Sequence, residues 1–251
     1  MNRSIVIPFF VTMLSLNSQL SYADNLKVAV AANFKQTIEA LKTEFEKDTT
    51  HTIQVISAST GQLVQQISHG APFDIFLAAN IAHPQILWQQ IHEQRGLDKG
   101  ALQVYANGRL VFFSNHPLTQ NKTLAEILSA DTYSRLSVAN PTLAPYGLAA
   151  KQTLECYNIA NNWKHKLVTG QNIAQTYQFI HSQSVNAGFV AQSQVLDQPP
   201  EQVRVVSSKC YDPIKQMALR LNNKPASQAF MTYLTQPKAK TIIENHGYDA
   251  P

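Results

Sequence analysis

Four stretches of the chain could bind an anion without any cationic side chain. Each combines a short apolar run with small, hydroxyl or amide residues at the start of an expected helix. The first turn of a helix presents backbone N–H groups that lack intrahelical acceptors, together with a partial positive charge, so it attracts anions. Several such starts facing one another would form a site for a small oxyanion. The four stretches are residues 28–33, 55–61, 138–147 and 169–173.

Three of these helix starts show the spacing of a capping box, in which a cap residue is followed three positions later by glutamine. In a capping box the cap side chain and the glutamine side chain each bind one free backbone N–H. Ordinary helix caps give the same pattern, so the spacing alone does not identify a binding site. The loops contain small residues and no acidic residue, which favours an anion site. The pairs are Asn33 with Gln36, Ser59 with Gln62, and Asn172 with Gln175.

Other patterns with chemical potential are weak. The eight histidines are scattered, without an HExxH motif or a Cys/His cluster, so no metal site is expected. The GxSxG, GxxxxGK[ST] and GxGxxG motifs are absent, which leaves the hydrolase, P-loop and dinucleotide-binding classes without a motif. Asp74 begins an apolar segment, where we expect a structural role such as accepting hydrogen bonds from backbone N–H groups. No catalytic residue is expected.

The first 23 residues have the pattern of an export signal. Arg3 supplies a positive charge, residues 5–16 are mostly apolar, and residues 21–23 form a small-x-small cleavage site. Pro8 interrupts the apolar run, which is also short for a membrane span, so a cleaved signal is favoured over an anchor. The mature chain is expected to begin at Asp24, after cleavage at Ala23, and to be soluble in the periplasm.

Charge and cysteine content limit the possible partners and cross-links. The formal net charge of +4 is dispersed, with no basic run of the kind that binds nucleic acid, so no nucleic-acid partner is expected. Cys156 and Cys210 are the only cysteines. In an oxidising compartment they can form one disulfide, but two separately buried thiols fit the sequence equally well.

The mature chain alternates strand-like and helix-like segments, which is typical of an α/β fold. Phe34, Ile38, Leu41 and Phe45 recur at helical spacing and predict one buried helix face. Segments 102–110 and 214–221 are candidates for strands that cross between two lobes, which would leave the last two helices on the first lobe. Strands are expected at 26–31, 52–56, 73–79, 109–114, 136–139, 188–191, 203–206 and 214–221, and helices at 34–45, 63–67, 84–93, 122–129, 147–156, 173–180, 226–234 and 237–247.

A set of motifs in fixed order resembles the periplasmic molybdate-binding proteins of ABC transporters. The motifs occupy residues 31–34, 57–61 with 70–76, 140–149, and 188–191, and the resemblance extends from residue 26 to 247. It implies a type II periplasmic-binding-protein fold, in which two α/β lobes, each a mixed sheet flanked by helices, are joined by a two-strand hinge. The oxyanion would lie in the cleft. Lobe 1 would comprise residues 24–104 and 216–251, and lobe 2 residues 105–215.

The resemblance also implies which residues bind the anion. Two positions depart from another branch of the family: Asn33 stands where that branch has serine, and Ala191 stands where it has a liganding tyrosine. Tyr146 is therefore expected to supply the phenol. Thr60 stands where the family usually has a liganding serine, and Ile173 would donate a backbone N–H. The complete implied set is Ala32, Asn33, Ser59, Thr60, Tyr146 and Ile173.

The implied function is a periplasmic receptor that captures molybdate, and also tungstate, for a membrane permease and its ATPase. The rim would contain only neutral donors, which suit a fully deprotonated oxyanion better than a protonated phosphate. Molybdenum or tungsten would be bound as the oxyanion, with no direct metal ligand and no cofactor, and a monomer is expected. The alternatives are a receptor for sulfate, chromate or a small organic anion, and an exported hydrolase. Cavity size separates the oxyanions, and the residues do not reveal it.

Overall fold

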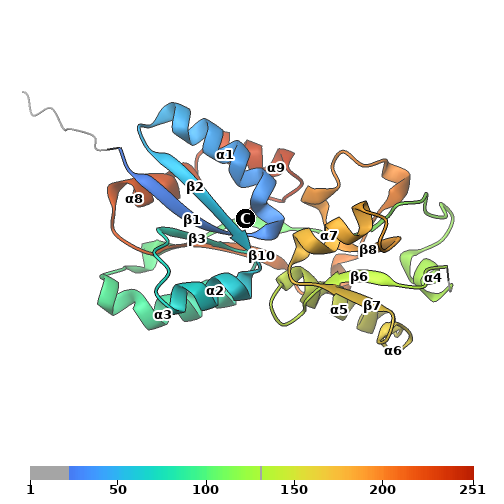
Figure 1. Cartoon of the computed structure of the whole chain (residues 1–251). Coiled ribbons are helices and arrows are strands. Elements are labelled where there is room, and N and C mark those ends of the chain that lie inside the picture. Colours follow the sequence, from blue (N-terminus) through green and yellow to red (C-terminus); the bar gives the residue numbers. More distant parts are fainter. Residues whose placement is uncertain (1–22, 131) are drawn as a thin grey trace, which may run out of the picture.

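Two five-stranded sheets flanked by helices form two lobes that lie side by side (Figure 1). The computed structural model describes residues 23–130 and 132–251, so the expected signal lies outside the described residues apart from Ala23. The first sheet has the order β2-β1-β3-β10-β4 and the second the order β7-β6-β8-β5-β9. Both sheets contain parallel and antiparallel pairs. The predicted α/β fold with two mixed-sheet lobes is therefore confirmed.

The first lobe is built from the beginning and the end of the chain. Its strands are β1 (Asn25–Ala31), β2 (Thr52–Ala58), β3 (Ile75–Ala78), β4 (Leu102–Gly108) and β10 (Ile214–Arg220). Its helices are α1 (Lys35–Asp48), α2 (Thr60–Ser68), α3 (Ala82–Arg95), α8 (Pro225–Tyr233) and α9 (Pro237–Asn245), with short 3-10 turns η1 (Ala32–Phe34) and η2 (Lys99–Ala101).

The second lobe is formed by the middle of the chain. Its strands are β5 (Leu110–Ser114), β6 (Leu136–Ala139), β7 (Leu167–Gly170), β8 (Ala187–Ala191) and β9 (Val203–Val205). Its helices are α4 (Leu124–Ser129), α5 (Pro145–Cys156), α6 (Ala160–Trp163) and α7 (Ile173–His181), with 3-10 turns η3 (Gln192–Gln194), η4 (Pro200–Gln202) and η5 (Ser208–Cys210). Within the described residues, no helix has the length and apolar character needed to cross a membrane.

The predicted face of α1 packs in the core of the first lobe. Phe34, Ile38, Leu41 and Phe45 are all buried, and the ring of Phe45 meets that of Phe230 from α8 edge-on at 5.3 Å. Helix α9 also contacts α1. The last two helices therefore cover the first lobe, as the sequence predicts.

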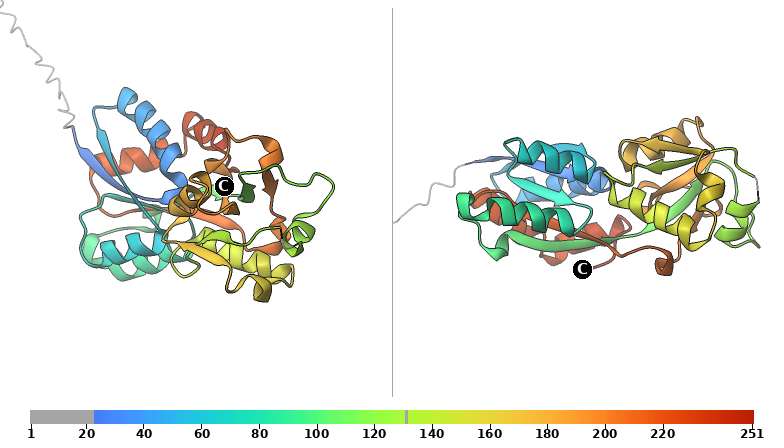
Figure 2. Two further views of the ribbon diagram at one scale, coloured as in Figure 1. Left: turned by 45° about the vertical axis from the view of Figure 1, so that its right-hand side comes forward. Right: turned by 90° about the horizontal axis from the view of Figure 1, so that it is seen from below.

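The chain passes between the lobes at two neighbouring places. Strand β4 continues through Arg109 into β5, and β9 continues through residues 206–213 into β10. Strands β4 and β10 pair antiparallel with Gly108 opposite Ile214, and a bulge shifts their register between Gln216 and Met217. Figure 2 shows β4, in green, running from the first lobe toward the second. The two expected crossing segments thus lie beside each other.

A disulfide joins Cys156 to Cys210, a pairing that the sequence left open. Cys156 is the last residue of α5, and Cys210 lies in η5, on the segment that leads into β10. Their Cα atoms are 5.3 Å apart. The bond therefore fixes the end of α5 to one of the two passages between the lobes.

Asp74 has the structural role that its position predicts. Its carboxylate accepts hydrogen bonds from the Lys27 backbone N–H at 2.7 Å, from Asn222 Nδ2 at 2.7 Å and from Lys224 Nζ at 2.9 Å. Burial by itself would raise the pKa of Asp74, but these donors outweigh burial and lower the pKa below its ordinary value. The carboxylate thus ties the start of β1 to the segment that follows β10.

We expect Asp74→Ala to lower the free energy of unfolding by about 1–3 kcal/mol at neutral pH, because buried hydrogen bonds to a charged group are lost. Urea denaturation measures the change. A carboxyl with a lowered pKa stabilises the fold above its unfolded pKa of about 3.9, and this stabilisation is lost as the pH falls. The difference between wild type and variant should therefore shrink toward about pH 3. A difference that is the same at both pH values would contradict this role.

Candidate functional site

The six residues implied by the sequence are all buried, and the most exposed of them, Ala32, has an exposed fraction of 8%. Ala32, Tyr146 and Ile173 belong to one apolar cluster that also contains Ala79, so the cluster spans both lobes. The Thr60 hydroxyl accepts a hydrogen bond from the Ala79 backbone N–H at 3.1 Å. The structure therefore brings residues from both lobes together at one place.

The lobes are in direct contact around these residues. The Gly61 N–H of α2 donates to the Leu143 carbonyl, in the loop before α5, at 2.9 Å. A side chain at Gly61 would press on Leu143, whose backbone lies 3.2 Å from the place of a Cβ. The Ser193 hydroxyl of η3 donates to the Asn33 carbonyl at 2.9 Å. The site is thus closed, with each lobe covering the other.

Two of the three predicted capping residues do cap their helices. Ser59 and Gln62 form a complete capping box at the start of α2. Asn172 caps α7 by accepting from the Ala174 and Gln175 N–H groups, both at 3.0 Å. The Gln175 side chain, however, binds the Gln171 N–H at 2.7 Å instead of completing a box.

The third capping prediction is wrong. Asn33 lies inside the turn η1, and α1 follows Phe34 without a side-chain cap. Asn33 Nδ2 instead donates to Gln216 Oε1 at 3.0 Å and to the Tyr248 hydroxyl at 3.1 Å. The Tyr248 hydroxyl in turn donates to the Asn33 carbonyl at 2.7 Å. The Asn33 side chain therefore forms hydrogen bonds with distant buried residues and does not cap a helix.

Sequence reasoning missed the other members of this buried network. Gln216 Oε1 also accepts from the Tyr105 hydroxyl at 2.9 Å, and Gln216 Nε2 lies 3.5 Å from the Tyr146 hydroxyl. The one available signal was Gln216 itself, a glutamine within the apolar strand β10. A polar side chain that is fully buried in a strand requires partners, but the sequence does not say which residues they are.

The hydrogen bonds determine which groups keep a hydrogen to donate. The Thr60 hydroxyl and the Tyr146 hydroxyl are acceptors in the contacts described, so the hydrogen of each is not used there. The Ser59 hydroxyl lies 2.8 Å from Gln62 Oε1 and donates to it. Ser59 is one of the expected ligands, but its hydroxyl hydrogen is already used by its own helix cap.

Backbone donors also face this region. Thr60 and Ile173 are the first residues of α2 and α7, where helix geometry provides no intrahelical acceptor for the N–H group. Within residues 23–130 and 132–251, no other protein group accepts from these two N–H groups. Two helix starts, one from each lobe, thus offer backbone donors.

The electrostatics of the site favour an anion. Burial raises the pKa of the Tyr146 phenol well above its ordinary value of 10, so the phenol keeps its proton at physiological pH. The first turns of α1, α2, α5 and α7 contain no acidic residue. An anion here would meet neutral donors and the positive ends of helices. In the described part of the chain, no group of three or more His, Cys, Asp and Glu residues could hold a metal ion.

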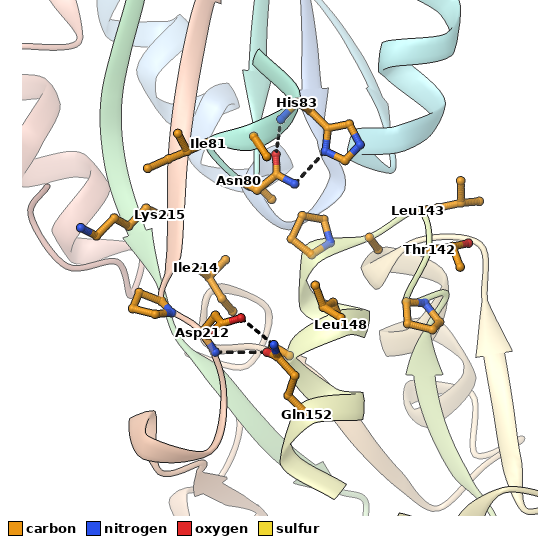
Figure 3. Close-up of a pocket in the computed structure, with 17 residues that line it drawn as sticks. Asn80, Ile81, His83, Thr142, Leu143, Leu148, Gln152, Asp212, Ile214 and Lys215 are labelled. Carbon is orange, nitrogen blue, oxygen red and sulfur yellow. Dashed lines mark hydrogen bonds between the residues drawn. The ribbon is translucent and has the colours of Figure 1, made fainter. Parts of the chain in front are cut away.

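An open pocket of about 600 Å³ lies between the lobes beside the buried residues (Figure 3). Asn80 and His83 line it from the first lobe, and Leu148 and Gln152 from the second. Its wall also includes Ala79, whose N–H donates to the Thr60 hydroxyl, and residues 144–145, which directly precede Tyr146 in the chain. None of the six implied residues lines this pocket. The pocket therefore adjoins the buried site and does not contain it.

Comparison with known proteins agrees with this architecture. The family described as "Bacterial extracellular solute-binding protein" matches residues 26–249. The molybdate-binding protein ModA of Azotobacter vinelandii is 38% identical over 232 residues, covering 90% of each chain. ModA of Rhodobacter capsulatus is 33% identical over 229 residues, covering 90% of this chain and 88% of its own.

The fold comparison leads to the same group of proteins. The solved structure of the Azotobacter vinelandii periplasmic molybdate-binding protein matches with a TM-score of 0.80 at 29% sequence identity, covering 90% of this chain and 99% of its own. The profile match, the sequence relatives and the shared two-lobed fold together place this chain among the bacterial extracellular solute-binding proteins.

Proposed function

We propose that the protein is a periplasmic receptor that binds molybdate between its two lobes. The observation that carries the proposal is the convergence of neutral donors from both lobes, with no acidic residue in the first turns of the helices that meet there. The sequence relatives named for molybdate binding support molybdate as the solute. Because the family consists of solute-binding proteins, the chain is a binding protein and not an enzyme.

The donors have distinct proposed roles. Thr60 contributes its hydroxyl and its backbone N–H, Tyr146 its phenol, and Ile173 its backbone N–H. Ala32 and Asn33 contribute backbone N–H groups, because both hydrogens of the Asn33 side-chain amide are used by Gln216 and Tyr248. Ser59 holds the start of α2 in place. No cofactor is required, and the metal stays within its oxyanion.

The donor set predicts selectivity for a fully deprotonated oxyanion. Each hydrogen bond to an anion contributes roughly 1.5–3 kcal/mol. A protonated phosphate would direct an O–H at a donor, with no acceptor opposite it. Tungstate has the shape and charge of molybdate, so we propose it as a second ligand. Sulfate is smaller and would leave some of the donors out of reach.

We further propose that the signal segment directs export to the periplasm. The receptor, as a monomer, would then deliver the oxyanion to an ABC permease driven by its ATPase. The proposal rests on the expected signal at residues 1–23 and on membership of an extracellular solute-binding family.

Isothermal titration calorimetry with molybdate, tungstate, sulfate and phosphate tests the proposal. We expect saturation by molybdate and tungstate at about micromolar concentration or below. Sulfate should bind far more weakly, and phosphate should give no heat of binding. Sulfate binding as tight as molybdate would favour the same-fold alternative of a sulfate receptor. No heat with any of the four anions would reject an oxyanion receptor.

We expect Thr60→Ala to weaken molybdate binding by about 1–3 kcal/mol, because one donor to the anion is lost. Thr60→Ser is the matched control, since it keeps the hydroxyl, and it should bind nearly as tightly as wild type. Ser59→Ala should instead lower the free energy of unfolding by about 1 kcal/mol through the lost cap, with little change in affinity. Calorimetry and urea denaturation measure the two quantities. Unchanged affinity in Thr60→Ala would show that the Thr60 hydroxyl does not donate to the anion and has only a structural role.

The affinity for molybdate should be independent of pH between about pH 6 and 9. Backbone N–H and hydroxyl groups do not titrate in this range, and burial raises the pKa of the Tyr146 phenol above its ordinary value. The affinity should fall only above the raised pKa of the phenol, because an ionised phenolate repels an anion and cannot donate to it. Titrations at several pH values in one buffer system measure this. A slope within the window would show that an ionisable side chain, such as a histidine, contacts the ligand.

A further inference from the structure

The hydroxyl of Tyr146 lies against two residues on the paired strands that lead between the lobes. Gly108 is the last residue of β4, and Gln216 lies near the start of β10. A Cβ atom at position 108 would lie 2.1 Å from the Tyr146 oxygen and 2.9 Å from Gln216 Nε2. The phenol oxygen thus occupies the space that any side chain at this position would need. We refer to Gly108 and Gln216 as the phenol seat.

Glycine is required at position 108 for space and not for backbone conformation. Gly70, Gly96 and Gly247 have positive φ angles, the region that favours glycine, but Gly108 does not. An alanine at 108 could therefore adopt the same backbone. Its methyl group would nevertheless displace the Tyr146 hydroxyl, since a 2.1 Å separation is far inside van der Waals contact.

Gln216 determines the direction in which the Tyr146 hydrogen points. Its Oε1 accepts from Asn33 Nδ2 at 3.0 Å and from the Tyr105 hydroxyl at 2.9 Å, which fixes the orientation of the amide. The Nε2 group therefore faces the Tyr146 oxygen, at 3.5 Å. An amide nitrogen donates and does not accept. The Tyr146 hydrogen must then point away from Gln216.

The seat connects the two lobes. Tyr146 lies on α5 of the second lobe, whereas Gln216 and its partner Asn33 lie in the first. The bulge between Gln216 and Met217 is the one register shift between β4 and β10, and it lies where the Gln216 side chain meets Tyr105. Bulges alter the direction of neighbouring side chains.

We infer that Gly108 and Gln216 are positioning residues, which hold the Tyr146 hydroxyl as a donor toward the bound oxyanion. The inference rests on the proposed function, because it takes Tyr146 to contact the oxyanion. Gly108 sets the place of the phenol oxygen, and Gln216 sets the direction of its hydrogen. Neither residue needs to touch the anion.

A double-mutant cycle with Gly108→Ala and Tyr146→Phe tests the role of Gly108. Calorimetry with molybdate should show that Gly108→Ala alone weakens binding by about tenfold or more, which corresponds to the loss of one hydrogen bond to an anion. In the Tyr146→Phe background the same alanine should cost less than about threefold, because the oxygen it would displace is gone. The two contacts that remain, Gln216 Nε2 at 2.9 Å and the ring carbon Cζ at 3.0 Å from the added methyl, need only small shifts. Equal costs in both backgrounds would mean that the alanine merely perturbs the strand, and would overturn the inference.

Gln216→Glu tests the direction of the hydrogen. A carboxylate at this position would accept the Tyr146 hydrogen and turn it away from the anion, and its charge would repel the anion as well. The variant should bind molybdate at least about tenfold more weakly at pH 8 than wild type. Its affinity should rise toward about pH 6, because burial favours the protonated acid, whose O–H can donate to the phenol. A structural defect would give a loss without this pH dependence, and that result would overturn the role of Gln216. Tyr133→Phe is the control: its hydroxyl lies 3.2 Å from the Ser114 hydroxyl, outside this network, so affinity should change less than about threefold.

The same variants also separate this inference from the proposed function. If wild type binds no oxyanion, the proposed function fails, but the seat can still be measured in the free protein. Urea denaturation of the Gly108→Ala and Tyr146→Phe cycle should show that alanine lowers stability more in the presence of the phenol than in its absence. If the two substitutions change the free energy of unfolding additively, the Tyr146 hydroxyl does not occupy the space beside Gly108, and the phenol seat is overturned. Tight molybdate binding with additive changes in affinity would overturn its role in binding.

Discussion

A variant carrying both Cys156→Ser and Cys210→Ser is expected to lose about 4 kcal/mol of unfolding free energy. The two cysteines are separated by 54 positions, so the disulfide closes a long loop in the unfolded chain. In the chain-entropy model, such a loop reduces the entropy of the unfolded state by an amount that grows with the logarithm of its length. Cys156 is exposed and Cys210 is half-buried, so serine can be solvated at both positions. The loss should therefore come mainly from the unfolded state.

Urea denaturation of the variant and of wild type measures this difference. Wild type unfolded in the presence of a reductant should match the variant, which controls for effects of serine. Molybdate affinity should change less than about threefold, because Tyr146 lies at the other end of α5, about 15 Å away along the helix. A stability difference below about 1 kcal/mol would show that the bond does not constrain the unfolded chain in this way.

Tyr146→Phe is expected to weaken molybdate binding by about 1.5–3 kcal/mol, or roughly tenfold to a hundredfold. The substitution removes a donor to the anion, and it leaves Gln216 Nε2 without the oxygen that it faces. The ring itself is buried in the apolar cluster that spans both lobes, where phenylalanine packs equally well. The free energy of unfolding should consequently change much less than the affinity.

Calorimetry measures the affinity, with Tyr133→Phe as the matched control. Tyr133 lies in the same apolar cluster, and its hydroxyl lies 3.2 Å from the Ser114 hydroxyl. Its loss removes a buried hydroxyl from the same lobe without touching Asn33, Gln216 or Tyr146. Equal affinities of Tyr146→Phe and wild type would show that the phenol is not a ligand, and that a different donor arrangement operates.

The features that the sequence predicted well depend on local physics. The helical spacing of Phe34, Ile38, Leu41 and Phe45 predicts a buried face because an α-helix repeats every 3.6 residues. Gly70 follows the predicted helix at 63–67 and Gly247 ends the predicted helix at 237–247, and both adopt the left-handed conformation typical of a helix end, with φ of +86° and +81°. Short-range patterns of this kind were sufficient for the α/β class and for most of the order of strands and helices, but they missed α6 (Ala160–Trp163) and β7 (Leu167–Gly170).

The features that the sequence could not predict depend on residues far away in the chain. Asn33 has the spacing of a helix cap, but residues 183 and 215 positions away engage its side chain instead. Capping is a competition between local and distant partners, and only the folded structure decides it. Gly108 gives no local sign of whether it serves backbone conformation or space. The motifs identified the residues that we propose bind the ligand, whereas the residues that we propose orient them could not be identified from the sequence.

The position of β10 determines when the first lobe can fold. This strand lies between β3 and β4 in the first sheet, although it comes from near the end of the chain. Synthesis must reach Arg220 before that sheet can be completed, whereas all five strands of the second sheet precede β10. Pairing between distant segments is also slow, because the chain loses the entropy of closing a long loop before any stabilising contact forms. A growing chain therefore keeps its first half incomplete until it is nearly finished, which suits a protein that we propose crosses a membrane before it folds.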